Sequence, residues 1–120
     1  MNFGDFVRIR RTELGFTLRD FCQTFGHDPS NWSKVERGKL PPSDDQAVLD
    51  DWAEQLNIKK GTENWQMFLD LAFRERGKIP PDILANEKYS DAVLRFFKLL
   101  REQKPTDEDL VRFIGIFSKK

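Results

Sequence analysis

A short segment of the sequence, residues 29–37, carries small polar and cationic side chains at helical spacing. Stepped at about 100° per residue, its hydroxyl and cationic groups fall within about 60° of one direction: Ser30, Ser33, Lys34 and Arg37. Trp32 and Val35 point to the opposite side. Short hydroxyls can approach the hydrogen-bonding edges of bases, and cations can meet phosphates. The pattern is typical of a helix in a DNA major groove, and equally of the solvent side of an ordinary amphipathic helix.

The elements that position this segment are predicted to be helices, because no stretch alternates apolar and polar residues for long enough to form a strand. Thr17 is a suitable N-cap for a helix over 18–25, and Gly26 ends it. Asp28 then caps the helix over 29–37, which starts with a proline. Two short helices joined by a turn at residues 26–27 have the sequence form of a helix-turn-helix.

Further helices are expected on both sides of this pair. One runs over about 2–14, and another runs to about residue 56 with Ser43 as its N-cap. A helix opened by Gly61 or Thr62 is broken by the proline-containing segment 77–82. Helical stretches follow at 83–84 and 89–103, and a last helix follows Thr106 in a pattern close to a capping box. The chain is therefore predicted to be all-α.

The spacing from Leu14-Gly15 through Phe25-Gly26 to Val35-Glu36-Arg37-Gly38 resembles the helix-turn-helix of the lambda-repressor-like family, the Cro and Xre type of regulators. The resemblance covers about residues 3–58. It implies a five-helix lambda-repressor-like DNA-binding bundle, which we place at residues 1–75. Additional C-terminal helices at residues 76–120 would extend it, the two parts forming one compact unit.

The resemblance also implies a role for each polar side chain around the segment. The helix over 29–37 would enter the major groove, as in the phage repressors that define this docking geometry. Three residues would hold base-edge positions: Ser30, Ser33 and Lys34. Asn31 would reach a base or the sugar-phosphate backbone. Phosphates would be contacted by Thr17, Arg19, Arg37 and Lys39. An ion pair between Arg11 and Glu36 would orient the reading helix.

Composition limits the other functions that this chain can have. The 20 Lys and Arg balance the 20 Asp and Glu, so any attraction for phosphate must be local. Residues 1–42 carry a net charge of +2, from seven basic and five acidic side chains, whereas 43–58 hold five acids and no base. The single cysteine, Cys22, and the single histidine, His27, cannot form a disulfide framework or a zinc site. We expect no enzymatic activity, no metal and no cofactor.

The location and partners follow from apolar patterning. No run approaches eighteen apolar residues and the first residues lack a secretory signal, so we expect a cytoplasmic protein without a membrane partner. The extension is rich in large apolar side chains, which either cover the N-terminal bundle or pair two subunits; we favour a homodimer on double-stranded DNA. The leading hypothesis is a transcriptional repressor. The alternatives are an antitoxin-type module that binds a toxin partner through the C-terminal helices, and a helix-turn-helix used only as a scaffold.

Overall fold

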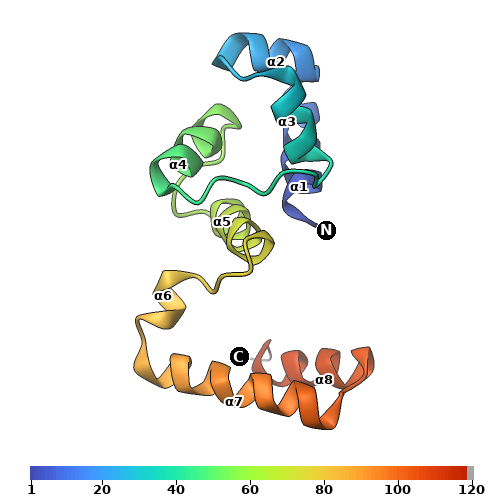
Figure 1. The fold of residues 1–120 in the computed structure, drawn as a ribbon, viewed down its shortest axis with the longest axis vertical. Helices are drawn as coiled ribbons and strands as arrows, with labels where there is room; N and C mark the ends of the chain where they lie inside the picture. The colour runs from blue at the N-terminus through green and yellow to red at the C-terminus, as the bar shows by residue number, and fades with distance from the viewer. Residues whose placement is uncertain (119–120) are drawn as a thin grey trace. The chain divides into compact units, whose positions relative to one another are not determined.

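The structure of the chain is a computed structural model that describes residues 1–118. Every regular element in that range is an α-helix, which confirms the all-α prediction (Figure 1). The eight helices of the described residues are α1 Phe3–Glu13, α2 Leu18–Phe25, α3 Pro29–Glu36, α4 Gln46–Gln55, α5 Glu63–Glu75, α6 Pro81–Leu84, α7 Glu87–Gln103 and α8 Asp107–Ser118.

The chain divides into two compact units. The first, Met1–Pro80, holds α1 to α5, and the second, Pro81–Lys120, holds α6 to α8. The sequence prediction placed the boundary after residue 75. The segment between α5 and α6 cannot continue a helix, because Gly77 has a φ of +69° and two prolines follow at 80 and 81.

The helix-turn-helix pair forms with the predicted caps. The Thr17 hydroxyl oxygen accepts a hydrogen bond from the Asp20 amide at 3.1 Å. Gly26 ends α2 in the left-handed conformation, with a φ of +75°. The Asp28 carboxylate then accepts from the Asn31 amide at 3.2 Å and so opens α3. These caps satisfy amides that the first helical turn leaves without partners, and they fix where each helix begins.

The predicted start of α4 was wrong by two residues. The helix begins at Gln46, and its N-cap is Asp45, whose carboxylate accepts from the Ala47 amide at 2.9 Å. Ser43 instead accepts from the amide of Asp45 at 3.1 Å. A serine hydroxyl can bond an amide two residues along in a turn as readily as it caps a helix. The turn therefore takes up Ser43, and the helix starts later.

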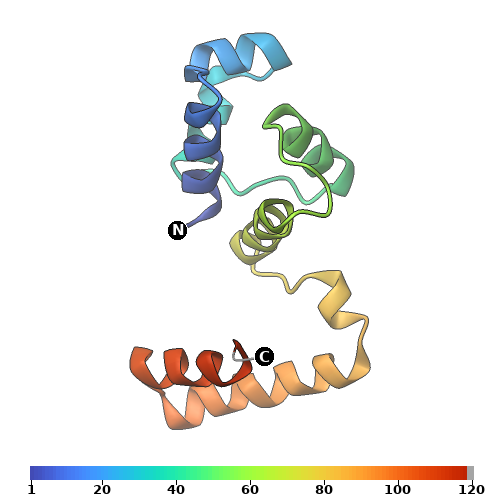
Figure 2. The same ribbon diagram turned by 180° about the vertical axis from the view of Figure 1, so that it is seen from behind.

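The core of the first unit lies where α1, α2, α3, α4 and α5 meet. In this unit α1 packs against both α3 and α5, and α2 packs against α3 (Figure 2). The largest side chains in its centre are fully buried: Phe3, Val7, Phe21, Leu56 and Phe68. Removing this apolar surface from water is the main force that holds the five helices together.

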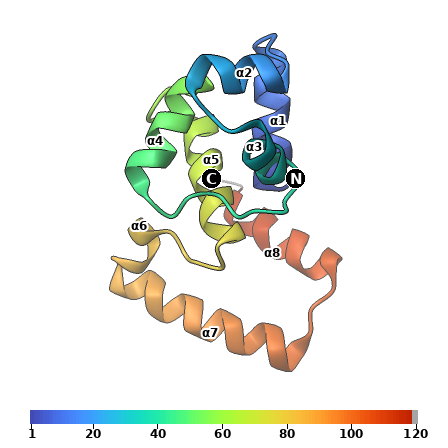
Figure 3. The same ribbon diagram turned by 45° about the horizontal axis from the view of Figure 1, so that its top comes forward.

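The second unit is built around an antiparallel pair of helices. The chain reverses after α7 at Lys104, whose φ of +44° lies in the left-handed region, and α8 runs back at an angle to α7 (Figure 3). The α8 start is a reciprocal cap: the Asp109 amide donates to the Thr106 hydroxyl at 3.2 Å, and the Thr106 amide donates to Asp109 at 3.0 Å. The capping-box pattern predicted here is therefore confirmed, with Asp in place of the usual Glu or Gln.

Candidate nucleic-acid interface

One side of α3 is anchored in the core of the first unit. Trp32 is 2% exposed and Val35 is 7% exposed. The Trp32 ring lies between aromatic neighbours, with centroid distances of 5.0 Å to Phe21, 4.5 Å to His27 and 5.0 Å to Trp52. Such close aromatic contacts add to the stability that burial itself supplies. The rotation of α3 about its own axis is therefore fixed by its inner side.

A buried ion pair fixes the C-terminal end of α3 against α1. The Arg11 Nε donates to Glu36 Oε2 at 2.8 Å, and Arg11 Nη2 donates to Glu36 Oε1 at 2.9 Å. The same carboxylate accepts from the indole nitrogen of Trp32 at 2.6 Å, and Arg11 Nη1 donates to the carbonyl of Phe16 at 2.8 Å. The ion pair predicted between Arg11 and Glu36 is present. Its two-pronged geometry determines the direction of the helix as well as its distance from α1.

The electrostatics of this pair follow from its contacts. The hydrogen bond to Glu36 raises the pKa of Arg11 above its ordinary value, and the charge of Glu36 acts in the same direction against the effect of burial. Cys22 lies nearby and is 1% exposed, and burial raises the pKa of its thiol. With these pKa shifts the Arg11 guanidinium stays charged and the Cys22 thiol stays protonated and unreactive, so both groups have a structural role.

Gly4 allows α1 and α3 to approach each other closely. A Cβ at this position would lie 2.7 Å from the carbonyl oxygen of Val35 and closer still to that of Glu36. Only glycine leaves room for the α3 backbone to lie against the first turn of α1. This close approach was not predicted from the sequence; the available signal was a glycine inside a well-capped helix, where alanine is normally favoured.

The outer side of α3 presents the predicted polar residues to solvent. Ser30, Asn31 and Lys34 are exposed, and so is Arg37, which forms the C-cap. Ser33 is half-buried, and its hydroxyl accepts a hydrogen bond from Arg37 Nε at 3.2 Å. The structure therefore gathers all five side chains on or beside α3, but it engages Ser33 and Arg37 with each other.

The residues predicted to contact phosphate lie on the elements next to α3. Arg19 is exposed on α2, one residue after Leu18, and Lys39 is exposed in the segment that follows α3. Thr17 is exposed too, and its hydroxyl oxygen already caps α2. The N-terminal turn of α2 therefore combines backbone amides, a hydroxyl and a cation, which are the groups that bind phosphate at helix starts.

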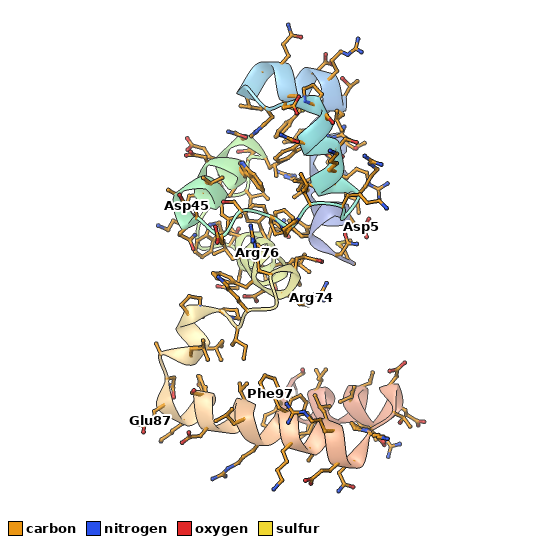
Figure 4. The ribbon with its side chains drawn as sticks, in the orientation of Figure 1. Asp5, Asp45, Arg74, Arg76, Glu87 and Phe97 are labelled. Atoms are coloured by element: carbon orange, nitrogen blue, oxygen red, sulfur yellow. The ribbon has the colours of Figure 1, made fainter. Side chains whose placement is uncertain are left out.

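The segment after α3 is tied to α5. Arg76 Nε donates to the carbonyl of Pro42 at 2.7 Å, and Arg74 Nη2 donates to the carbonyl of Met1 at 2.8 Å (Figure 4). These hydrogen bonds join segments far apart in the sequence, so spacing along the chain could not predict them. The Arg76 bond holds the connector that carries Lys39 against the end of α5, and the Arg74 bond ties the N-terminal residue to α5.

His27 has a role that was not assigned from the sequence. Its ring stacks on Trp32 and, at 5.6 Å between centroids, on Phe21, and its Nε2 lies 2.6 Å from Oε1 of Gln55 on α4. The turn is thus joined to α4 by the hydrogen bond with Gln55, while the His27 ring stacks on side chains of α2 and α3. A lone histidine in a turn offers no spacing pattern from which this could have been inferred.

Residues 1–118 contain no group of three His, Cys, Asp or Glu side chains that could hold a metal ion. No helix in the same range has both the length and the apolar character needed to cross a membrane. Comparison of the chain with family models, curated proteins and solved structures finds no match.

Proposed function

We propose that this protein is a sequence-specific double-stranded DNA-binding transcriptional regulator, acting as a repressor, and that α3 reads the major groove. The observation that carries the proposal is the division of α3 into two sides. Trp32, Val35 and Glu36 hold the inner side, whereas Ser30, Asn31 and Lys34 are exposed on the outer side. A rigidly held helix with short polar side chains and a cation facing outward fits the width and chemistry of the groove.

The proposed fold of residues 1–80 is the lambda-repressor-like bundle, as the resemblance of its helix-turn-helix segment implies. In that arrangement Ser30, Lys34 and Asn31 contact base edges. Phosphates on either side are contacted by Thr17, Arg19, Arg37 and Lys39. The Ser33 hydroxyl accepts from Arg37 Nε and keeps its own hydrogen to donate to a base, while the Nη groups of Arg37 can turn to a phosphate.

The distribution of charge supports the same assignment. The whole chain is neutral, but residues 1–42 carry a net charge of +2, from seven basic and five acidic residues. The buried pair of Arg11 and Glu36 is neutral as a unit, so the net charge of +2 belongs to the other charged residues of this segment. The acidic residues of α4 lie on another element than the exposed cations of α2 and α3. A local excess of positive charge is sufficient to attract a duplex, and the attraction weakens as salt rises.

The proposed regulator acts as a homodimer, because one α3 spans too few base pairs for useful selectivity. A two-fold pair would place its two α3 helices about 34 Å apart on one face of the duplex. The second candidate function is an antitoxin-type module that grips a toxin partner. The observation that favours it is the exposed apolar surface of the second unit, where Val111, Ile114 and Ile116 are each more than 60% exposed.

Selection of bound duplexes from a random pool tests the proposal. The full chain should enrich one sequence with two half-sites, and the Asn31→Ala and Lys34→Ala variants should each bind it about 5- to 150-fold more weakly. Lys60→Ala, which removes an exposed lysine outside the helix-turn-helix, is the matched control and should bind like the wild type. A pool that stays random after repeated selection would contradict sequence-specific binding and favour the interaction module.

A further inference from the structure

An open groove of about 630 Å³ runs between α7 and α8 in the second unit. Its floor is apolar and is made by five side chains: Ala92, Phe96, Leu99, Leu110 and Phe113. Phe96 and Phe113 stack across it with centroids 5.8 Å apart. Leu99 and Phe113 remain 46% and 47% exposed. The stacked rings of Phe96 and Phe113 join the two helices, and much of their apolar surface stays open.

The second unit has no core of its own. None of the residues 81–118 is buried. A segment of about 40 residues seldom folds stably without a metal, a disulfide or a partner surface. The large apolar side chains of α7 and α8 that stay exposed lie on several sides of the two helices, and two of them, Leu99 and Phe113, line the groove.

The rim of the groove carries charges of both signs. Lys88, Asp91 and Arg95 line it from α7, and Asp109 lines it from α8. Asp91 and Arg95 are one turn apart and exposed, yet neither takes part in an ion pair within residues 1–118. A surface that offers an acid and a base side by side is complementary to a copy of itself turned through 180°.

We propose that two copies of this chain pair through the α7–α8 groove and form a four-helix bundle. In this geometry the α7 helices lie antiparallel about a two-fold axis near Val93. Asp91 of each copy then faces Arg95 of the other, and the apolar floors close on each other, as in helical bundles. The pairing surface deepens the proposed function, since it supplies the two copies that a two-fold operator requires, but its own test needs no DNA.

A charge exchange on the full chain tests the pairing. By sedimentation velocity the wild type should have twice the mass of one chain. Asp91→Arg and Arg95→Asp should each weaken self-association about 10- to 100-fold, because like charges then face each other twice in the interface. An equimolar mixture of the two variants should restore the dimer, since opposite charges then meet at both positions. Arg101→Asp makes the same charge change on α7 outside the groove and should leave the dimer intact.

The equimolar mixture distinguishes a loss of pairing from a folding defect, because two misfolded variants would not form a dimer on mixing. A wild type that stays monomeric at tens of micromolar would overturn the proposal and assign the groove to the first unit or to another protein. Equal weakening by Arg101→Asp, or no recovery in the mixture, would also overturn it. A dimer that selects no duplex would contradict the DNA-binding proposal alone, and a monomer that does select one would contradict the pairing alone.

Discussion

Glu36 is the residue on which the position of α3 depends most directly. The Glu36 carboxylate accepts three hydrogen bonds, two from Arg11 and one from Trp32, and Glu36 is only 6% exposed. Removing one member of a buried pair leaves the other charge without a partner in a medium of low polarity. The buried side chain therefore determines the position of α3 and is not itself available to a ligand.

We predict that Glu36→Gln lowers the free energy of unfolding by about 3–5 kcal/mol, because Arg11 would remain charged and buried without a countercharge. The hydrogen bond to Glu36 and the Glu36 charge are what raise the pKa of Arg11, so the substitution removes that charge-assisted support and leaves burial, which lowers this pKa. Urea unfolding followed by circular dichroism measures the change. The exposed Glu54→Gln is the control and should stay within about 0.5 kcal/mol; equal losses would contradict a special role for the pair.

For single residues, the sequence predicted which side chains face solvent better than it predicted which side chains contact each other. The outward direction of Ser30 and Lys34 follows from helical periodicity alone, since Trp32 and Val35 must face the core. The partner of Arg11 came from the family resemblance. The spacing does not show that Arg37 donates a hydrogen bond to Ser33. Both residues lie on the same polar side, and the side-chain rotamers determine whether they bond each other or water.

The seating of α3 on α1 is a property of two elements that pack together. Gly4 lets the carbonyl groups at the end of α3 lie against the first turn of α1. The same end of α3 is held by the Arg11 side chain two turns further along α1. Backbone approach and ion pair together leave α3 little freedom to tilt, which is the preorganisation that groove reading needs.

Gly4→Ala should destabilise the protein by about 1–3 kcal/mol, because the added methyl group overlaps the α3 backbone and forces the helices apart. The usual gain of about 0.5–1 kcal/mol from replacing a helical glycine by alanine is then outweighed. Gly115→Ala in α8 is the matched control, since its Cβ would meet nothing within 4 Å, and it should raise helicity. Thermal unfolding by circular dichroism distinguishes the two. Stabilisation by both substitutions would show that the packing of α1 on α3 can relax.

Helix boundaries were predictable wherever a cap and a stop agree. Thr17 with Gly26 bounds α2, and the same logic holds for Asp28 and for Thr106. The prediction was wrong at Ser43, because three consecutive residues could each cap the helix and the local turn leaves the third of them, Asp45, as the N-cap. The choice among adjacent caps depends on how the connector from α3 is held. The hydrogen bond from Arg76, which is far away in the sequence, holds that connector at Pro42.

The whole molecule combines zero net charge with an uneven arrangement of charge. Binding of a duplex by such a chain must depend on a few phosphate interactions, and each of them releases counterions from the DNA. Residues 81–120 carry eight basic and seven acidic residues, so the second unit adds nearly balanced charge together with exposed apolar surface. A pairing role for this part of the chain was among the hypotheses from sequence, but that none of the residues 81–118 is buried became visible only with the helices in place.

Replacing Arg37 and Lys39 together by alanine should weaken binding to all duplexes alike. The slope of log affinity against log salt should fall by about one unit for each phosphate interaction that the substitutions remove. Fluorescence anisotropy between roughly 50 and 200 mM salt measures the slope. Lys78→Ala, which removes an exposed cation beyond α5, should leave the slope unchanged. A slope that is indifferent to Arg37 and Lys39 would show that neither side chain binds phosphate.

An NMR titration of the full chain with its selected duplex tests whether the outer side of α3 contacts DNA, as we propose. Amide shifts should concentrate at Ser30, Asn31 and Lys34, with smaller ones at Thr17 and Arg19, where the start of α2 meets a phosphate. Shifts confined to residues 81–118, with α3 unchanged at saturation, would contradict the account.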